Sequence, residues 1–477
     1  MYKKKYLWCF LGVILVLGLF TSSVWGCYAI VVGRDASVDG AVLLGHNEQN
    51  DGQRFINLRK VPRMRHKVGE KIRLMGGAQI EQVSESYAFL WSENPGIPYS
   101  DAYLNEWGVA IVSDVCRGHK ESPQELEAGG QLVQGGISYL LRRLIIERAK
   151  TAREGVEVGG RLIEQVGYPK TRTLVIADRN EAWLLSMAGG KHWAAQRVPD
   201  NGVVLLPNVY IIGEINPRDK KNFLSSPGLI EYATERGWYN PAGGEPFRFW
   251  QVYGGSRKRL MDMRQWRGQC EVTGKIIAKE PDRQLPFSVK PDRKLSIKDV
   301  VTILRTHGKG TICGKATQEA AVFQLRSKLP VEIGCVYWRT SAEPCTSVLT
   351  PWYIGITETP HQYYQQVDIN KQLTLEHHFS ESPEKFRPDD KHAWWIFKKL
   401  QDEVHRDYAK RVKIVRQQWD KYEAGLFDKQ GEIERKALEL YRKDKPTAME
   451  YLTDYCRDTA IKAVNKAQEL TGEIARK

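Results

Sequence analysis

Apolar runs with two different periodicities alternate along this chain, and their order limits the fold more than any other feature. Short runs rich in Val, Leu and Ile, typical of buried strands, come first: 28–32, 41–45, 87–91 and 109–113. Residues 136–167 then place apolar side chains at helical spacing with charge on the other face, which predicts two helices. A second series of predicted strands follows: 173–177, 182–187, 193–198, 203–206 and 209–212.

The last part of the chain returns to helical patterns. The stretch "LSIKDVVTILRTHG" predicts a helix with Ser296 as N-cap and Gly308 as its stop. Two final strands are predicted at 345–349 and 352–356. From about residue 388 the pattern is helical and charged, with a break near Lys445. The order of strands, helices, strands and helices predicts an α+β layered domain with a helical C-terminal region.

The first 26 residues have the three parts of a secretory signal peptide. Lys3, Lys4 and Lys5 precede an almost wholly apolar run over 6–20, and small residues lead to Gly26. A helix that spans a membrane needs about 20 apolar residues, so this segment fits a cleaved signal peptide better than a spanning helix. An uncleaved membrane anchor is the alternative. The sequence predicts a periplasmic or secreted protein that contacts the membrane only through this transient segment. Cleavage after Gly26 would leave Cys27 as the first residue.

Charge and cysteine spacing exclude several partner classes. The net charge is +14, but Lys and Arg alternate with Asp and Glu, and no nucleic-acid motif is present, so no nucleic-acid partner is expected. None of the eight cysteines has C-x-x-C spacing or a His at metal-site spacing, so neither a metal nor another cofactor is predicted. One disulfide among Cys313, Cys335 and Cys345 is expected outside the cytosol, with the pairing left open.

A cysteine at the start of a mature chain can act as a self-contained catalyst. Its α-amine has a pKa of about 7.7–8.0, close to working pH, so it suits a general base that removes the thiol proton. The thiolate of Cys27 can then attack a carbonyl and form a thioester that water hydrolyses. Such a site also needs hydrogen-bond donors for the oxyanion.

The rival interpretation of Cys27 is a lipoprotein site. The lipoprotein pattern asks for a small residue two positions before the cysteine, where this chain has Trp25. Lipidation alkylates the sulfur and acylates the amine, so it would remove both catalytic groups. The two interpretations therefore exclude each other.

The residues that follow Cys27 favour catalysis. The stretch "CYAIVVGRDASVDGAVLLGHNEQND" resembles the mature start of the C69 dipeptidases, which are N-terminal nucleophile hydrolases related to secernins and choloylglycine hydrolases. The segments "YLNEWGVAIVSD", "VIADRNEAWLLSMAGGKHWAAQRVP" and "VYWRTSAEPCTSVLTPWYIGITETP" continue the resemblance in order. It implies a four-layer αββα sandwich with a helical C-terminal region. The expected division is a removed signal peptide over 1–26, a hydrolase domain over 27–385 and a packed helical region over 386–477.

The resemblance also implies roles for individual residues. Cys27 is the expected nucleophile, Asn105 an oxyanion donor, and Asn208 a second asparagine that orients the amine or the substrate carbonyl. Arg257 is the expected site arginine, with Arg259 as a rival. The catalytic set predicted from sequence is completed by two residues of the "GHNEQND" stretch, His46 and Glu48.

Two positions depart from the family pattern. His46 and Gln49 stand where the family usually has Arg and Asp. An arginine would lower the thiol pKa at all times, whereas His46 does so only when protonated. Gln49 brings no charge to hold the α-ammonium, which leaves Glu48 or Asp51 as substitutes.

The function expected from these observations is hydrolysis of dipeptides or short peptides by an exported cysteine-type dipeptidase. A hydrolase of acyl amides on the same fold and a lipid-anchored, non-catalytic binding protein are the alternatives. A homo-oligomer is left open.

Overall fold

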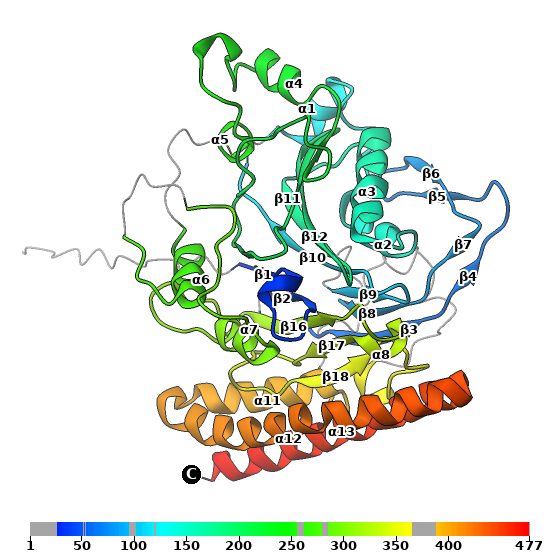
Figure 1. Ribbon diagram of the computed structural model, residues 1–477, viewed down its shortest axis with the longest axis vertical. Helices are drawn as coiled ribbons and strands as arrows, with labels where there is room; N and C mark the ends of the chain where they lie inside the picture. Colours follow the sequence, from blue (N-terminus) through cyan, green and yellow to red (C-terminus); the bar gives the residue numbers. More distant parts are fainter. Residues whose placement is uncertain are drawn as a thin grey trace, which may run out of the picture.

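Two stacked β-sheets between two layers of helices make up this protein (Figure 1). The computed structural model describes residues 26–50, 52, 54–94, 102–118, 121–254, 262–278, 285–364 and 388–476. The eight-stranded sheet is covered by α2 (Leu141–Ile146) and α3 (Ala152–Val166). The six-stranded sheet is covered on its outer face by α6, α7 and the long C-terminal helices. The predicted αββα arrangement is confirmed.

The six-stranded sheet holds the start of the described chain at its centre. Its order is β14-β1-β2-β16-β17-β18, and every neighbouring pair is antiparallel. The strands are β1 (Tyr28–Val32), β2 (Val42–Gln49), β14 (Val203–Leu206), β16 (Thr317–Leu325), β17 (Cys335–Arg339) and β18 (Thr350–Tyr353).

The eight-stranded sheet is also antiparallel, in the order β15-β13-β12-β11-β10-β9-β8-β3. Its strands are β3 (Asn57–Val61), β8 (Phe89–Glu93), β9 (Tyr103–Asn105), β10 (Ala110–Val115), β11 (Arg172–Ala177), β12 (Ala182–Gly189), β13 (His192–Arg197) and β15 (Phe223–Ser225). Two small two-stranded sheets pair β4 (Met64–Arg65) with β7 (Glu85–Ser86) and β5 (Lys71–Arg73) with β6 (Gln79–Glu81).

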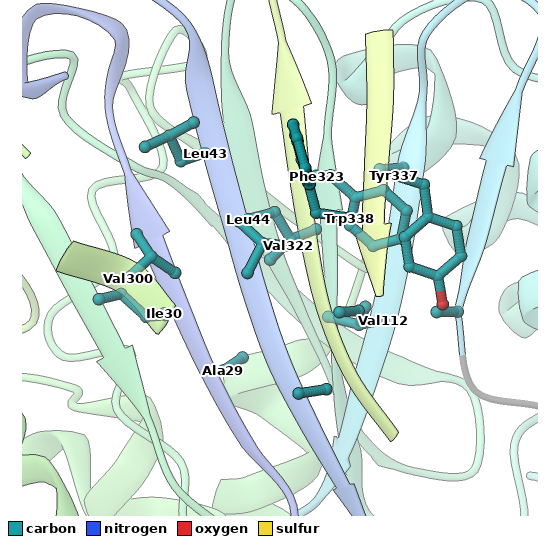
Figure 2. Close-up of a cluster of buried hydrophobic side chains, with 14 of the residues drawn as sticks. Ala29, Ile30, Leu43, Leu44, Val112, Val300, Val322, Phe323, Tyr337 and Trp338 are labelled. Carbon is teal, nitrogen blue, oxygen red and sulfur yellow. The ribbon is translucent and has the colours of Figure 1, made fainter. Parts of the chain in front are cut away.

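Burial on both faces explains why β1 reads as a continuous apolar run. Successive side chains of a strand point to opposite faces, and Figure 2 shows the apolar side chains that meet around β1, β2 and β16. Gly45 faces α7 closely: a Cβ there would lie 2.6 Å from Val300 and 2.7 Å from Ile30. Leu44 therefore points the other way, toward the second sheet, together with its cross-strand partner Phe323.

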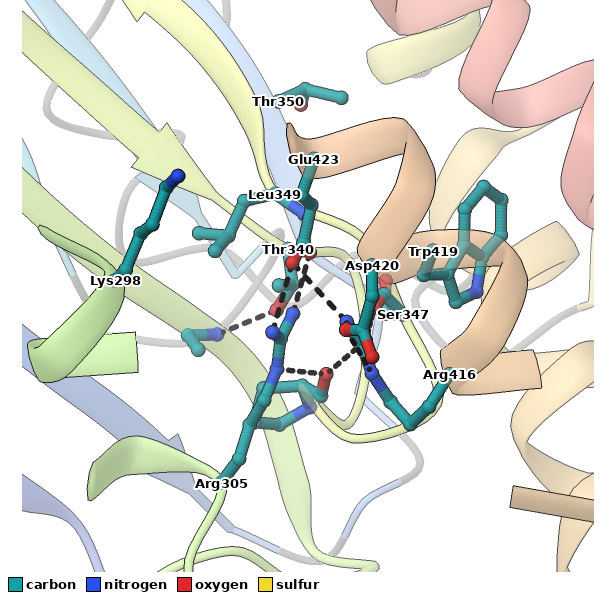
Figure 3. A network of polar contacts seen from close by, with 12 residues as sticks. Lys298, Arg305, Thr340, Ser347, Leu349, Thr350, Arg416, Trp419, Asp420 and Glu423 are labelled. Carbon is teal, nitrogen blue, oxygen red and sulfur yellow. Dashed lines mark hydrogen bonds and ion pairs between the residues drawn. The ribbon is translucent and has the colours of Figure 1, made fainter. Parts of the chain in front are cut away.

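The helices outside the six-stranded sheet are tied to it by apolar and charged contacts. They are α6 (Met263–Thr273), α7 (Ile297–Leu304), α11 (Ala393–His405), α12 (Tyr408–Lys443) and α13 (Lys445–Ala475). The ring of Trp338 on β17 lies 4.8 Å from that of Phe427 on α12. Arg305 after α7 and Arg416 of α12 both bind Glu423 of α12 (Figure 3).

Short helices complete the described chain: α1 (Pro123–Ala128), α4 (Leu229–Glu235), α5 (Phe249–Val252) and α8 (Val331–Gly334). Among the described helices, none combines the length and the apolar character needed to cross a membrane. The predicted signal segment lies outside the described residues, apart from Gly26. The division into 27–385 and 386–477 stays a prediction.

Most predicted elements are confirmed, including the break between α12 and α13 and the Ser296 N-cap, whose hydroxyl accepts a hydrogen bond from the Asp299 amide. Three predictions were wrong. Residues 209–212 form no strand, since Val209 makes only an isolated bridge. Residues 345–349 form turns, and α7 ends at Leu304 rather than at Gly308. The strands β16 and β17 were missed, and in β16 buried polar side chains interrupt the apolar pattern.

Candidate active site

Three residues predicted from the sequence meet where β1 begins. The register of β1 and β2 pairs Ala29 with His46, which places Cys27 and Glu48 level on the same face. The Cys27 sulfur, a ring nitrogen of His46 and a carboxylate oxygen of Glu48 lie within 4.8 Å of one another. All three side chains are buried between the sheets. We call Cys27, His46 and Glu48 the Cys27 cluster.

The main chain of the neighbouring strand holds the thiol. The Gln49 amide donates to the Cys27 sulfur at 3.5 Å, and the thiol lies 3.7 Å from the Gln49 carbonyl oxygen. The Gln49 side chain accepts a hydrogen bond from the Gly26 amide at 3.1 Å and donates to the Ile312 carbonyl at 2.6 Å. Gln49 therefore supports both the Cys27 thiol and the peptide that precedes Cys27, without a charge.

Arg264 and Asn208 hold the peptide between Gly26 and Cys27. The Arg264 guanidinium donates to the Gly26 carbonyl at 2.7 Å and to the Cys27 carbonyl at 3.2 Å. Its other terminal nitrogen donates to Asn208 Oδ1 at 3.0 Å, and Asn208 Nδ2 donates to the Val115 carbonyl at 2.9 Å. A Cβ on Gly26 would lie 2.0 Å from Asn208 Oδ1, so this contact requires glycine. The predicted proximity of Asn208 to Cys27 is present.

The arginine at this peptide differs from the sequence-based choice. Arg257 and its rival Arg259 lie outside the described residues, as does Asp51. Arg264 was missed because it lies in the first turn of α6 within a polar helix, where a basic residue is usually only a solvated side chain. Its proximity to Cys27 depends on the packing of α6 beside β14.

Asn105 does not join the Cys27 cluster. Its amide group donates to the carbonyls of Ile146 and Ala149 at 2.9 and 2.8 Å, and its oxygen accepts from the amides of Trp107 and Val109 at 3.0 Å each. All four hydrogen-bonding positions of the side chain are used, on the face of the eight-stranded sheet that packs against α2. The geometry thus gives Asn105 the role of a turn and helix-end residue and leaves no donor for an oxyanion.

Asp114 of β10 approaches the cluster from the other sheet. Its Oδ1 lies 3.7 Å from His46 Nε2, and both side chains are at most 1% exposed. Within the described parts of the chain, no hydrogen-bond partner reaches Asp114 Oδ1, Asp114 Oδ2 or His46 Nε2. A buried polar group without a partner is costly, so these atoms suit a ligand or water. The signal for Asp114 was an acidic residue in an otherwise apolar strand.

Arg172, at the start of β11, adds a permanent positive charge near the cluster. Burial lowers the pKa of its guanidinium, but nearby acidic groups outweigh burial and raise the pKa above its ordinary value. Those groups are two tyrosine hydroxyls, then the Cys27 thiol and the Glu48 carboxylate. Arg172 on the second sheet therefore supplies a permanent cation near the cluster, whereas His46 is a cation only when protonated.

The residue types of the Cys27 cluster can also bind a divalent metal ion. The Gln49 amide already donates to the Cys27 sulfur, and Asn50 Nδ2 donates to Glu48 Oε1 at 2.8 Å. The arrangement is better suited to nucleophilic chemistry, with a thiol, titratable neighbours and carbonyl-directed donors in one place.

Comparison with known proteins identifies the family. The model of peptidase family C69 matches residues 26–314. The chain belongs to peptidase family C69. The predicted family is thus confirmed, and the chain is a peptidase by family. The match begins one residue before Cys27 and includes Asn208, Arg264 and Asp114.

Curated relatives span most of the C69 chain. A probable dipeptidase from Salmonella dublin is 27% identical over 391 residues, which cover 76% of this chain and 87% of the relative. A probable dipeptidase from Latilactobacillus sakei is 24% identical over 412 residues, covering 80% and 82%. Penicillin V acylase from Agrobacterium tumefaciens is similar in structure over 69% of this chain and 86% of its own, at 12% identity. The TM-score of this match is 0.36.

Proposed function

We propose that this protein is an exported cysteine-type dipeptidase whose nucleophile, Cys27, becomes the first residue when the chain is cut after Gly26. The observation that carries the proposal is the placement of the Gly26–Cys27 peptide. The thiol lies in the Cys27 cluster, while Arg264 and Asn208 hold the carbonyl side of that peptide. The names of the curated relatives supply the substrate class.

The chemistry follows from freeing the α-amine. An N-terminal amine has a pKa of about 7.7–8.0, so near neutral pH a useful fraction is unprotonated. It accepts the Cys27 thiol proton, and the thiolate attacks the substrate carbonyl. The peptide nitrogen leaves with a proton, a thioester with Cys27 remains, and water hydrolyses it to release the second product.

Arg264 is the proposed donor to the oxyanion. In the described chain its guanidinium binds the Gly26 carbonyl at 2.7 Å, and removal of Gly26 frees this donor beside the nucleophile. Preorganised donors of this kind contribute about 10²–10³ in rate each. Asn208 holds the guanidinium in place through its Oδ1. This assignment replaces Asn105.

Asp114 is the proposed receptor for the free amine of the substrate. A dipeptidase has to recognise an ammonium group close to the scissile bond, and a buried carboxylate without a partner suits that group. Arg257 remains the sequence-based candidate for the substrate carboxylate. A second carboxylate, Glu48, lies within the Cys27 cluster and strengthens the preference for a cation.

Burial of Cys27 speaks against the lipoprotein alternative. Its side chain is 6% exposed and lies between the sheets. A diacylglyceryl group on the sulfur would have to pass through this buried cluster, which would separate the sheets. The catalytic interpretation needs no such rearrangement.

A substrate panel tests the proposal. The purified mature protein should release amino acids from unmodified dipeptides and leave N-acylated amino acids and other acyl amides intact. Tripeptides serve as the length control, and dipeptide amides test the need for a free carboxylate. Cleavage of acyl amides without cleavage of dipeptides would favour the acyl-amide hydrolase and overturn the dipeptidase assignment.

A further inference from the structure

Four side chains with metal-binding atoms meet outside the Cys27 cluster. They are His307 and Cys313, in the loop that follows α7, and Glu343 and Cys345, in the turns between β17 and β18. One ligand atom from each lies within 4.8 Å of the other three. The chain spacing gave no sign of this group, because the ligands come from two loops about 30 residues apart.

Burial and outer contacts indicate a built site. Glu343, Cys313 and Cys345 are 0%, 1% and 4% exposed, and His307 lies at the surface. The second Glu343 oxygen pairs with His405 Nε2 of α11. Carboxylate and imidazole ligands in metal sites are typically held by such outer partners.

Tyr408 selects the ring nitrogen that His307 can offer. The Tyr408 hydroxyl lies 2.9 Å from His307 Nε2 and donates to the Cys345 sulfur at 3.4 Å. The Tyr408 hydroxyl thus engages His307 Nε2, which leaves Nδ1 as the ring nitrogen that can face a metal ion.

The donor set matches a borderline-soft divalent ion. Zinc binds thiolate, imidazole and carboxylate with bonds of about 2.0–2.3 Å, so a tetrahedral ion keeps its ligand atoms roughly 3.3–3.8 Å apart. The Cys313 sulfur lies 3.8 Å from Glu343 Oε1, which is close to that spacing.

We propose that His307, Cys313, Glu343 and Cys345 form a structural zinc site that joins the loop after α7 to the turns after β17. The site also has a consequence for the Cys27 cluster. The Ile312 carbonyl, one residue before Cys313, accepts hydrogen bonds from Asn47 and Gln49 at 3.2 and 2.6 Å. An ion that fixes this loop stabilises the residues that support Cys27.

The competing use of this pair of cysteines is a disulfide. Cys313, Cys335 and Cys345, for which a disulfide was expected, form none within the described chain. Cys335 lies away from this group, beside Gly108. A bond between Cys313 and Cys345 would remove both sulfur ligands, so zinc binding and the disulfide exclude each other.

Metal analysis of the Cys27→Ala protein tests the proposal without interference from the active-site thiol. The reduced protein is loaded with Zn²⁺ and desalted, and about one zinc per chain is expected by elemental mass spectrometry. In the Cys313→Ser/Cys345→Ser variant, the zinc bound per chain should fall by at least about tenfold. The matched Cys335→Ser/Cys456→Ser variant changes two other buried cysteines and should retain it.

Cobalt substitution gives a readout that needs no ligand variant. Co²⁺ bound to the Cys27→Ala protein should produce a thiolate-to-metal charge-transfer band, and Zn²⁺ should abolish it by displacement. Absence of both bound zinc and this band would overturn the proposal. A Cys313–Cys345 disulfide in freshly isolated protein, seen before reduction as a peptide mass lower by two hydrogens, would also overturn it. Zinc that persists in the double variant would do the same.

Discussion

The thiol of Cys27 contacts the main chain of the neighbouring strand. Both the amide and the carbonyl of Gln49 contact the sulfur. The ring nitrogen of His46 in the cluster is a neighbour, but the geometry does not force it to be the base. We propose as the base the α-amine that cleavage after Gly26 would release.

Replacing the nucleophile should abolish activity while sparing the fold. We expect Cys27→Ala to lower kcat by at least about 10⁴-fold, in line with the loss of a nucleophile in other hydrolases. The Tm should change little, because alanine removes one sulfur atom from a polar cluster. Cys456→Ala, in the core of α13, is the control and should lose stability but not turnover. Retained dipeptide hydrolysis in Cys27→Ala would remove the nucleophile assignment.

Asp114→Asn should weaken recognition of the substrate amine. A hydrogen bond to a charged group contributes about 1.5–3 kcal/mol, so kcat/KM for dipeptides should fall about 10- to 100-fold. Asp219→Asn, in a turn before β15, is the control and should leave it unchanged. If Asp114 only positions His46, residual cleavage of an N-acetylated dipeptide should fall by the same factor, and the amine assignment would be wrong.

At the scale of single elements, one of the contacts that hold α12 against the sheet layer is centred on the buried carboxylate of Glu423. Glu423 accepts two hydrogen bonds from Arg305, at 2.9 and 2.6 Å, and one from the Leu349 amide at 2.9 Å (Figure 3). Glu423→Ala should lower the free energy of unfolding by about 3–5 kcal/mol, because Arg305, whose side chain is only 15% exposed, loses its charged partner. Asp420→Ala, on the same helix but 64% exposed, should cost at most about 1 kcal/mol. Equal costs in chemical denaturation would contradict this account.

The same residue predicts a pH dependence of stability. Burial raises the pKa of Glu423, but Arg305 and Arg416 outweigh burial and hold it below its ordinary 4.5. A lowered folded-state pKa stabilises the protein above the unfolded value, and that contribution is lost as pH falls. The difference in unfolding free energy between wild type and Glu423→Ala should therefore shrink below about pH 4.5. A difference that stays constant or grows would show that the carboxylate is not ionised in the fold.

The local sequence pattern was enough to predict strands whose two faces are apolar. It failed to predict β16, which carries buried polar side chains. β1 was predicted at its observed bounds because all its side chains are buried and apolar. β16 carries Glu319, which binds Ser92, Tyr337 and Arg339 between the sheets, so its sequence lacks a strand pattern. Those partners come from other strands and cannot be seen locally.

The candidate site divides in the same way. Cys27, His46 and Glu48 were predictable because two adjacent strands carry them, and short-range register brings them together. Asp114, Arg172 and Arg264 reach the site only through sheet stacking and helix packing. Asn105 was assigned to the site because its motif resembles the family sequence, whereas the fold places its side chain toward α2.

At the scale of the whole molecule, the C-terminal helices pack against the six-stranded sheet through apolar and charged contacts. Beyond Glu423, Arg326 of the sheet layer binds Glu434 of α12 at 2.7 Å, and Trp394 of α11 donates to the Gln318 carbonyl at 2.9 Å. We expect one cooperative thermal transition in calorimetry. A chain that ends at residue 387 should be insoluble or molten, because the apolar outer face around Trp338 would be exposed. A separate helical transition, or a soluble folded truncation, would show an autonomous C-terminal domain.

The account as a whole depends on the chemical state of residue 27. Intact mass and N-terminal peptide analysis of the protein isolated from its native host measure that state directly. The account predicts a chain that begins with an unmodified Cys27 and hydrolyses dipeptides. A lipid adduct on Cys27, or an active protein in which Gly26 still precedes it, would contradict the central claim.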